Sequence, residues 1–169
     1  MIEVQAPKPL TKEKNSKAIF LAGSIDMGKA IDWQKQIKEY CKDENVTFFN
    51  PRRDDFDPEL KQDINNPPFR EQVEWELNAL DASDIIVFFF DPKGKAPITL
   101  MELGIHTSSK DKKLIVCCEE GFWRKGNVDI VCKRYNIETV DSLDKLCERV
   151  KELVNSKKSW KKDIEKTIK

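Results

Sequence analysis

The sequence predicts an α/β fold, in which a doubly wound parallel sheet of five strands carries helices on both faces. Two features support this prediction. Short apolar runs alternate with amphipathic segments, and the connections between the runs are long enough to contain helices. The run at residues 85–90 is apolar without alternation, which is typical of a central parallel strand buried on both faces.

The predicted strands and helices follow each other in alternation along the chain. Apolar runs predict strands at residues 17–22, 46–49, 84–90, 113–118 and 137–140. Helical spacing of apolar residues predicts helices at residues 27–42, 69–80, 97–106, 128–133 and 143–154. Ser142 precedes the last helix and suits its N-cap.

The chain reads as one domain with two polar ends. No internal repeat or domain boundary interrupts residues 17–155, and this length is sufficient to bury a core. Residues 1–16 are polar and contain two prolines, so we expect a flexible lead-in. Residues 156–169 form a lysine-rich tail. Residues 56–68 have no period, and loops of this length are often lids or binding loops.

Charge and hydropathy exclude several classes of protein. The 30 basic residues are matched by 30 acidic residues, which removes the electrostatic argument for binding a nucleic acid polymer or an anionic membrane. No apolar run approaches the ~20 residues that span a bilayer. The first ten residues lack the basic-then-apolar order of a signal peptide. We therefore expect a cytoplasmic protein.

The metal-ligating residue types form no recognisable metal site. The spacing of the five cysteines fits neither a zinc site nor a disulfide framework, so we expect reduced thiols in or beside the core. These residues are Cys41, Cys117, Cys118, Cys132 and Cys147. His106 is the only histidine and cannot supply a histidine-rich metal centre, and nothing supports a Cys–His nucleophile. We predict no metal and no cofactor.

Glu102 gives the first signal of chemistry. It lies about one turn into the predicted helix 97–106, directly after the central strand and its loop, and apolar residues surround it in the sequence. Glutamate is rarely buried unless it is paired or has a function. On position alone, a glutamate that faces solvent from an amphipathic helix is the commoner explanation.

Polar residues also follow the first two predicted strands. Ligands bind at the carboxyl ends of the strands in open parallel sheets. Gly23 and Ser24 form a turn whose N–H groups and hydroxyl suit a phosphate or sugar oxygen, although such turns are also common without a ligand. Asn50, Arg52 and Arg53 leave the second strand, where a solvated, self-paired loop is the simpler explanation.

A second carboxylate, Glu76, lies on the predicted helix that precedes the central strand. If that helix brings Glu76 to the same crevice, two carboxylates face one pocket. Paired carboxylates cleave glycosidic bonds: one attacks the anomeric carbon, and the other handles protons on the leaving group. Asp91, at the end of the central strand, is a third candidate.

The order and spacing of several short motifs identify a family. The motifs are Phe20-Leu-Ala-Gly-Ser-Ile25, Trp33, Asn50-Pro-Arg-Arg53, Gln72-Val-Glu-Trp-Glu76, Ala82-Ser-Asp-Ile85 and Leu100-Met-Glu-Leu-Gly104. Together they resemble the nucleoside 2-deoxyribosyltransferases, and most closely the branch described as nucleoside 2-deoxyribosyltransferase-like. The likeness covers residues 17–150 and implies a flavodoxin-like, Rossmann-like parallel sheet.

The resemblance implies roles for individual residues. Glu102 corresponds to the family's nucleophile, and Glu76 to the acidic residue that contacts the base and the reacting sugar. A further aspartate of the transferases falls near Ala96 in this sequence, so Asp91 is the candidate to tune either carboxylate. The residues expected to contact the substrate are Phe20, Gly23, Ser24, Trp33, Asn50, Arg52, Arg53 and Met101.

The activity implied is N-deoxyribosyl transfer from a 2′-deoxynucleoside to another base, through a deoxyribosyl ester on Glu102. Three alternatives stay open. The first is a hydrolase of 2′-deoxynucleoside 5′-monophosphates, with a phosphate pocket formed by Ser24, Arg52 and Arg53. The second is a non-catalytic nucleotide sensor. The third is an interaction protein that uses the tail with Trp160. The partners implied are a small nucleoside or nucleotide, a free base and a second copy of the chain, since the family's sites are often completed across subunits.

Overall fold

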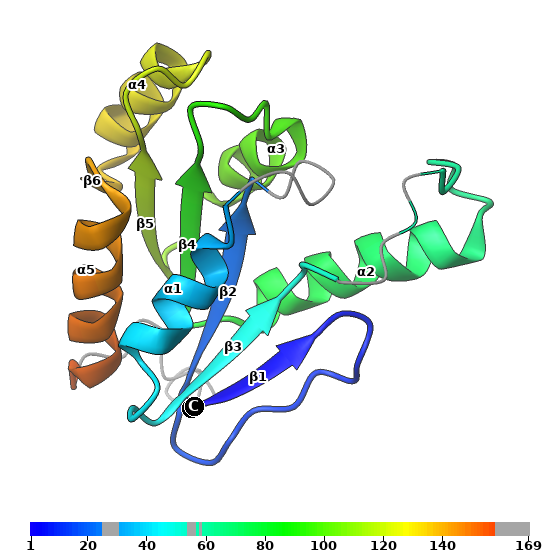
Figure 1. Cartoon of the computed structure of the whole chain (residues 1–169), viewed down its shortest axis with the longest axis horizontal. Helices are drawn as coiled ribbons and strands as arrows, with labels where there is room; N and C mark the ends of the chain where they lie inside the picture. The colour runs from blue at the N-terminus through cyan, green and yellow to red at the C-terminus, as the bar shows by residue number, and fades with distance from the viewer. Residues whose placement is uncertain (25–30, 54–56, 58, 158–169) are drawn as a thin grey trace, which may run out of the picture.

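A computed structural model of the chain describes residues 1–24, 31–53, 57 and 59–157, and it contains a parallel sheet between two layers of helices (Figure 1). The strands are β1 (Ile2–Gln5), β2 (Lys17–Gly23), β3 (Val46–Asn50), β4 (Ile85–Phe90), β5 (Lys113–Cys118) and β6 (Glu138–Val140). They lie in the order β1-β3-β2-β4-β5-β6, and each neighbouring pair is parallel. The predicted doubly wound fold is confirmed, and β2 to β6 have the flavodoxin-like strand order.

The sheet has six strands in the described chain, whereas the sequence predicted five. The additional strand β1 comes from residues 1–16, which we expected to be a poorly ordered lead-in. It pairs with β3 at the sheet edge, from Ile2 opposite Thr47 to Gln5 opposite Asn50. Val4 is 6% exposed and packs into the core. Four residues with two apolar side chains are too short a pattern to distinguish an edge strand from a linker.

Helices fill the connections between the strands, as predicted. They are α1 (Trp33–Tyr40), α2 (Pro67–Ala82), α3 (Pro97–His106), α4 (Lys125–Tyr135) and α5 (Leu143–Asn155). The predicted first helix began at residue 27, but residues 27–30 lie outside the described part of the chain. Two helices start with prolines, which suit a first turn because its N–H groups have no partner within the helix.

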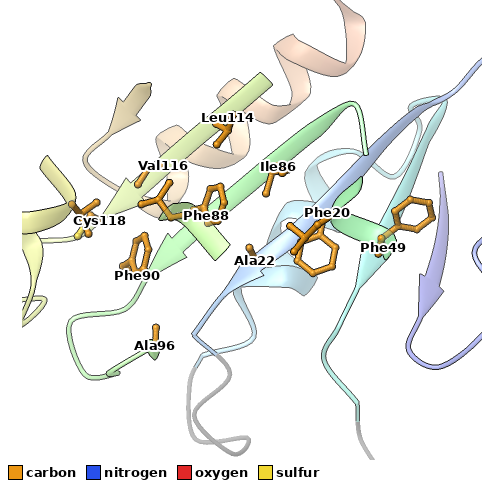
Figure 2. Close-up of a cluster of buried hydrophobic side chains, with 14 of the residues drawn as sticks. Phe20, Ala22, Phe49, Ile86, Phe88, Phe90, Ala96, Leu114, Val116 and Cys118 are labelled. Atoms are coloured by element: carbon orange, nitrogen blue, oxygen red, sulfur yellow. The ribbon is translucent and has the colours of Figure 1, made fainter. Parts of the chain in front are cut away.

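Strand side chains alternate between two buried faces of the sheet. One face carries Ile19, Leu21 and Val87 and packs against α1 and α5. The other face carries Phe20, Phe88 and the neighbouring side chains drawn in Figure 2. This face packs against α2, α3 and α4. Because both faces are covered, the central strands read as continuous apolar runs in the sequence.

The predicted crevice corresponds to the point where the strand order reverses, between the carboxyl ends of β2 and β4. Two hydrogen bonds join these ends. The Ser24 N–H donates to the Phe89 carbonyl at 3.1 Å, and the Asp91 N–H donates to Ser24 Oγ at 3.2 Å. Ser24 and Asp91, the first residues after β2 and β4, are therefore held together at this edge of the sheet.

Candidate active site

Glu102 lies on the buried side of α3, between the helix and the sheet. The residue is only 6% exposed, and its helix neighbours Thr99, Leu103 and His106 are buried with it. Its carboxyl group accepts no hydrogen bond from the described residues, and the His106 ring contacts its backbone carbonyl instead. The position of Glu102 in its own helix favoured a solvent-facing glutamate, whereas the structure gives a buried one.

Glu76 lies on α2 and is half-buried, and it is close enough to Glu102 for its charge to act on that carboxyl group. Its Oε1 accepts a hydrogen bond from Gln72 Nε2 at 2.8 Å, one turn earlier on the same helix. The structure thus brings together the two carboxylates that the sequence predicted as a pair.

The pKa values of both carboxyl groups are raised above the ordinary value for glutamate. Burial is the main cause for Glu102, and the nearby charge of Glu76 adds to it, raising the pKa of Glu102 to about 8. Burial also raises the pKa of Glu76, while the hydrogen bond from Gln72 lowers it. The pair therefore takes up protons at a higher pH than isolated glutamates do, and of the two carboxyl groups only that of Glu76 receives a hydrogen bond from a described side chain.

Asp91 is buried at 5% exposure, but its carboxylate has a local partner. Its Oδ1 accepts a hydrogen bond from the Lys93 N–H at 2.8 Å, which fixes the turn between β4 and α3. The pKa of Glu102 is raised by burial and by Glu76, and Asp91 is not among the causes. The structure therefore gives Asp91 a role in shaping the loop, and the predicted tuning role stays a prediction.

The loop after β3 reaches toward both α1 and α2. Asn50 is buried, with its Nδ2 donating to Glu3 Oε1 and its Oδ1 accepting from the Arg52 N–H. Arg52 Nη1 donates to the Ile31 carbonyl at 3.3 Å and to Gln34 Oε1 at 3.4 Å. These contacts order the loop at Asn50 and Arg52, and the self-pairing expected of the two arginines involves Asp54 and Asp55, which lie outside the described residues.

Arg53 connects the same loop to the carboxylate pair. Its Nη1 donates to Gln72 Oε1 at 3.4 Å, and Gln72 is the residue that bonds Glu76. Of the predicted substrate-contacting residues, Arg53 is thus linked to Glu76 through one intervening side chain.

Phe20, Trp33 and Gly23 belong to the packing beneath the crevice. Phe20 and Trp33 are fully buried on opposite faces of the sheet, so the expectation that they touch substrate is not supported by their positions. The Trp33 indole donates to the Ser24 carbonyl at 3.1 Å. A Cβ on Gly23 would lie 2.5 Å from the Trp33 ring and 2.7 Å from the Phe89 carbonyl oxygen, so the missing side chain makes room for the tryptophan. Apolar motif residues near a site and apolar core residues look alike in a sequence.

The positions of Met101 and Ser24 do not test their predicted contacts with the substrate, which stay predictions. Met101 is 53% exposed, on the side of α3 that carries the exposed Ile98 and Ile105, whereas Glu102 is on the buried side. Ser24 is 1% exposed, and its carbonyl, N–H and hydroxyl oxygen all bond within the protein. Its hydroxyl hydrogen is the one group of Ser24 with no assigned acceptor among the described residues.

Two residues of the site were not singled out by the sequence. Gln72 bonds Glu76, and the signal that could have identified it is its i, i+4 spacing to a glutamate on one helix face. His106 is 4% exposed, with Nδ1 at 3.0 Å from the Glu102 carbonyl oxygen and Nε2 at 4.0 Å from Asp81 Oδ1. It therefore supports the Glu102 turn of α3 against the end of α2.

The described residues contain no group of three or more His, Cys, Asp or Glu side chains that could hold a metal ion. None of their helices is long and apolar enough to cross a membrane. All five cysteines are buried and unbonded, as predicted. The chemistry that this site offers is that of two interacting carboxyl groups.

Comparison with known proteins identifies the family. The family model described as "Nucleoside 2-deoxyribosyltransferase like" matches residues 16–122. The chain belongs to this family. The matched segment contains every candidate site residue, from Phe20 to Glu102, and the resemblance inferred from the short motifs is confirmed. No protein of curated function matches the chain in sequence.

Two solved structures share the fold at low sequence identity. One is a conserved protein from Enterococcus faecalis V583, with a TM-score of 0.55 and 16% identity, covering 82% of this chain and 99% of its own. The other is the CMP N-glycosidase BcmB from Clostridium botulinum, with a TM-score of 0.51 and 15% identity, covering 79% of this chain and 98% of its own. At these identities the likeness establishes the fold.

Proposed function

We propose that the protein cleaves the N-glycosidic bond of a 2′-deoxynucleoside and transfers the deoxyribosyl group to another base. The observation that carries the proposal is the carboxyl group of Glu102, which is buried, accepts no hydrogen bond from the described residues and lies close enough to Glu76 to interact with its charge. Such a carboxyl group has little to stabilise its charge until a substrate arrives. Membership of the deoxyribosyltransferase-like family supports the same chemistry.

The first step forms an ester and releases the base. A Glu102 oxygen bonds to C1′ of the sugar, the C1′–N bond breaks, and its electron pair goes to the base. The anionic charge on Glu102 favours the oxocarbenium-like transition state. The base takes up the proton that the pair holds, which Glu76 delivers, because Glu102 must be ionised to attack.

The second step reverses these roles. A nitrogen of the incoming base attacks C1′, the ester bond to Glu102 breaks, and Glu76 takes the proton that the incoming base loses. Two displacements at the same carbon give net retention. The single proton of the pair is restored at the end of the cycle.

Hydrolysis of a nucleoside 5′-monophosphate is the second candidate function. The arginine-containing loop after β3 suits a phosphate group, and the chain shares its fold with a CMP N-glycosidase. In this case water takes the place of the second base. Incubation with a 2′-deoxynucleoside or its monophosphate, with and without a second free base, separates the two. A nucleoside that carries the new base indicates transfer, and free deoxyribose or its phosphate indicates hydrolysis.

The nucleophile is tested by trapping. After incubation with a 2-fluoro-2-deoxynucleoside, mass spectrometry of a digest should find the sugar on the peptide that contains Glu102. Glu102→Gln should lower turnover by about 10³-fold or more while substrate still binds. A sugar adduct on another residue would contradict the mechanism, and substrate binding without turnover by the wild-type protein would favour a non-catalytic sensor.

Two further predictions concern partners and location. We expect a homo-oligomer, because sites of the family are often completed across subunits, and light scattering after size-exclusion chromatography measures the mass directly. The use of the lysine-rich tail as an interaction segment involves Trp160, which lies outside the described residues. Deletion of residues 156–169 without change in activity or in oligomeric state would remove that alternative. The cytoplasmic location stays a prediction.

A further inference from the structure

Among the described residues, only the side chain of Gln72 donates a hydrogen bond to a carboxyl group of the Glu76–Glu102 pair. Its Nε2 lies 2.8 Å from Glu76 Oε1 and 3.2 Å from the Pro51 carbonyl oxygen. Its Oε1 lies 3.4 Å from Arg53 Nη1. One amide therefore contacts α2 and the loop after β3 at the same time.

The chemistry of these three partners fixes which way the amide points. A carboxylate and a carbonyl accept hydrogen bonds, so both require the amide nitrogen, whereas a guanidinium only donates and requires the amide oxygen. If the amide were turned by 180°, its NH₂ group would meet the N–H groups of Arg53, and its oxygen would meet the carboxylate oxygen of Glu76. The Arg53 contact thus keeps the Gln72 NH₂ group directed at Glu76.

The consequence for the pair is an asymmetry between its two members. Glu76 receives a hydrogen bond, while the Glu102 carboxyl group receives none from the described residues. Among the described residues, Glu102 on α3 is close enough to interact with the charge of Glu76, and Arg53 on the loop after β3 contacts Gln72. A hydrogen bond to one carboxylate favours the ionised form of that carboxylate.

We propose that Gln72 is a positioning residue that holds Glu76 in place and determines which member of the Glu76–Glu102 pair carries the shared proton. In the free protein Gln72 keeps the charge on Glu76 and the proton on Glu102. Loss of that hydrogen bond on substrate binding, as an oxygen of the sugar competes for Gln72 Nε2, moves the proton to Glu76 and leaves Glu102 ionised for attack. This inference rests on the proposed function for its role in turnover, while the asymmetry of the pair stands without it.

The test compares Gln72→Met, which keeps length and volume but cannot donate, with Asn78→Leu as the matched control. Asn78 lies on the same helix, is exposed and has no place in the proposed site. We expect the acid limb of the kcat/KM profile to move to higher pH in Gln72→Met, while the alkaline limb stays in place. The alkaline limb reflects the loss of the proton from Glu102. Glu76 is ionised both before and after that step, so a change in the stability of the Glu76 anion does not move this limb.

The size of the effect follows from the loss of one charge-assisted hydrogen bond. The ratio of the rate at pH 5 to the rate at pH 7 should fall by about three- to tenfold in Gln72→Met and stay unchanged in Asn78→Leu. An equal loss of rate at every pH, with both limbs in place, would mean that Gln72 only packs, and it would overturn the proposal.

A second measurement does not depend on any activity. Carboxyl ¹³C titration of the free protein, with assignments from Glu76→Gln and Glu102→Gln, follows the two groups directly. In Gln72→Met the Glu76 resonance should titrate at higher pH than in the wild type. If that shift occurs in a protein without glycosidic activity, the asymmetry holds and the proposed function fails. If the Glu76 titration is unchanged in a folded Gln72→Met protein, the inference fails whatever the activity.

Discussion

At the scale of single residues, the glycine at the end of β2 shows that the candidate site and the hydrophobic core are in direct contact. Gly23 was predicted to bind substrate, and in the structure the Trp33 ring and the Phe89 carbonyl occupy the space where its side chain would be. The tryptophan in turn bonds the Ser24 carbonyl, and Ser24 bonds the loop that leads to α3. A change at Gly23 therefore reaches the site through packing.

Substitution of this glycine should be costly. Gly23→Ala places a methyl group against a buried ring and a backbone oxygen, and overpacking of this kind destabilises by about 1–3 kcal/mol. Gly104→Ala is the control, because no atom outside its own helix lies within 4 Å of the added Cβ and alanine favours the helix by about 0.5–1 kcal/mol. Urea unfolding of the two variants measures both effects. Equal stability of the two would show that the Trp33 ring moves freely aside.

The carboxylate pair was found from the sequence, but its surroundings were not. The family motifs pointed to Glu102 and Glu76, because both glutamates lie within motifs whose residues and spacing can be recognised in the sequence. Phe20 and Trp33 were predicted to contact the substrate, because the sequence does not show whether an apolar residue in a motif lines a site or packs in the core. Gln72 was passed over because a glutamine on a helix is usually solvated, and its function depends on a loop 19 residues earlier in the chain.

At the scale of elements, β1 shows the limit of reading periodicity. The strands β2 to β6 were predicted, β2 to β5 from mostly apolar runs and the edge strand β6 from its place between two predicted helices. An edge strand buries one face only and has one neighbour, so it needs fewer apolar residues. β1 buries Val4 and exposes Ile2, and a second contact comes from Glu3, whose Oε1 accepts from Lys38 and Asn50 at 2.7 Å each.

β1 should contribute measurably to stability through Val4. Val4→Ala removes buried methyl groups and should lower the free energy of unfolding by about 1–3 kcal/mol. Ile2→Ala removes apolar atoms from the exposed side of the same strand and should cost less than about 0.5 kcal/mol. Chemical denaturation gives both values. If the two variants are equally stable, β1 does not form part of the cooperative core in solution.

At the scale of the whole molecule, the buried carboxyl pair links folding to pH. The pKa of Glu102 rises from 4.5 in the unfolded chain to about 8 in the folded protein, so the folded protein binds the proton more tightly. Stability from this group is therefore fully present below pH 4.5 and is lost as the pH rises toward 8. The raised pKa of Glu76 acts in the same direction.

Removal of the charge should reverse this loss. Glu102→Gln should be more stable than the wild type by a few kcal/mol at pH 8 and above, and the difference should shrink as the pH falls to 4.5. Glu71→Gln, at an exposed position of α2, should show no such trend. Unfolding curves at several pH values measure the difference. A stability gap that does not depend on pH would mean that Glu102 is ionised in the folded protein at little cost.

The buried cysteines make the two faces of the sheet separately observable. Cys41, Cys117 and Cys147 lie in the layer under α1 and α5, and Cys118 and Cys132 lie in the layer under α2, α3 and α4. Burial raises the pKa of Cys117 and of Cys118 to about 12, which leaves almost no reactive thiolate while the fold is closed. Alkylation then reports the opening of each layer, and mass spectrometry of the labelled peptides tells whether the side that carries Glu76 and Glu102 opens before the other. The native cysteines thus report local unfolding separately for the two faces of the sheet, and no probe has to be introduced.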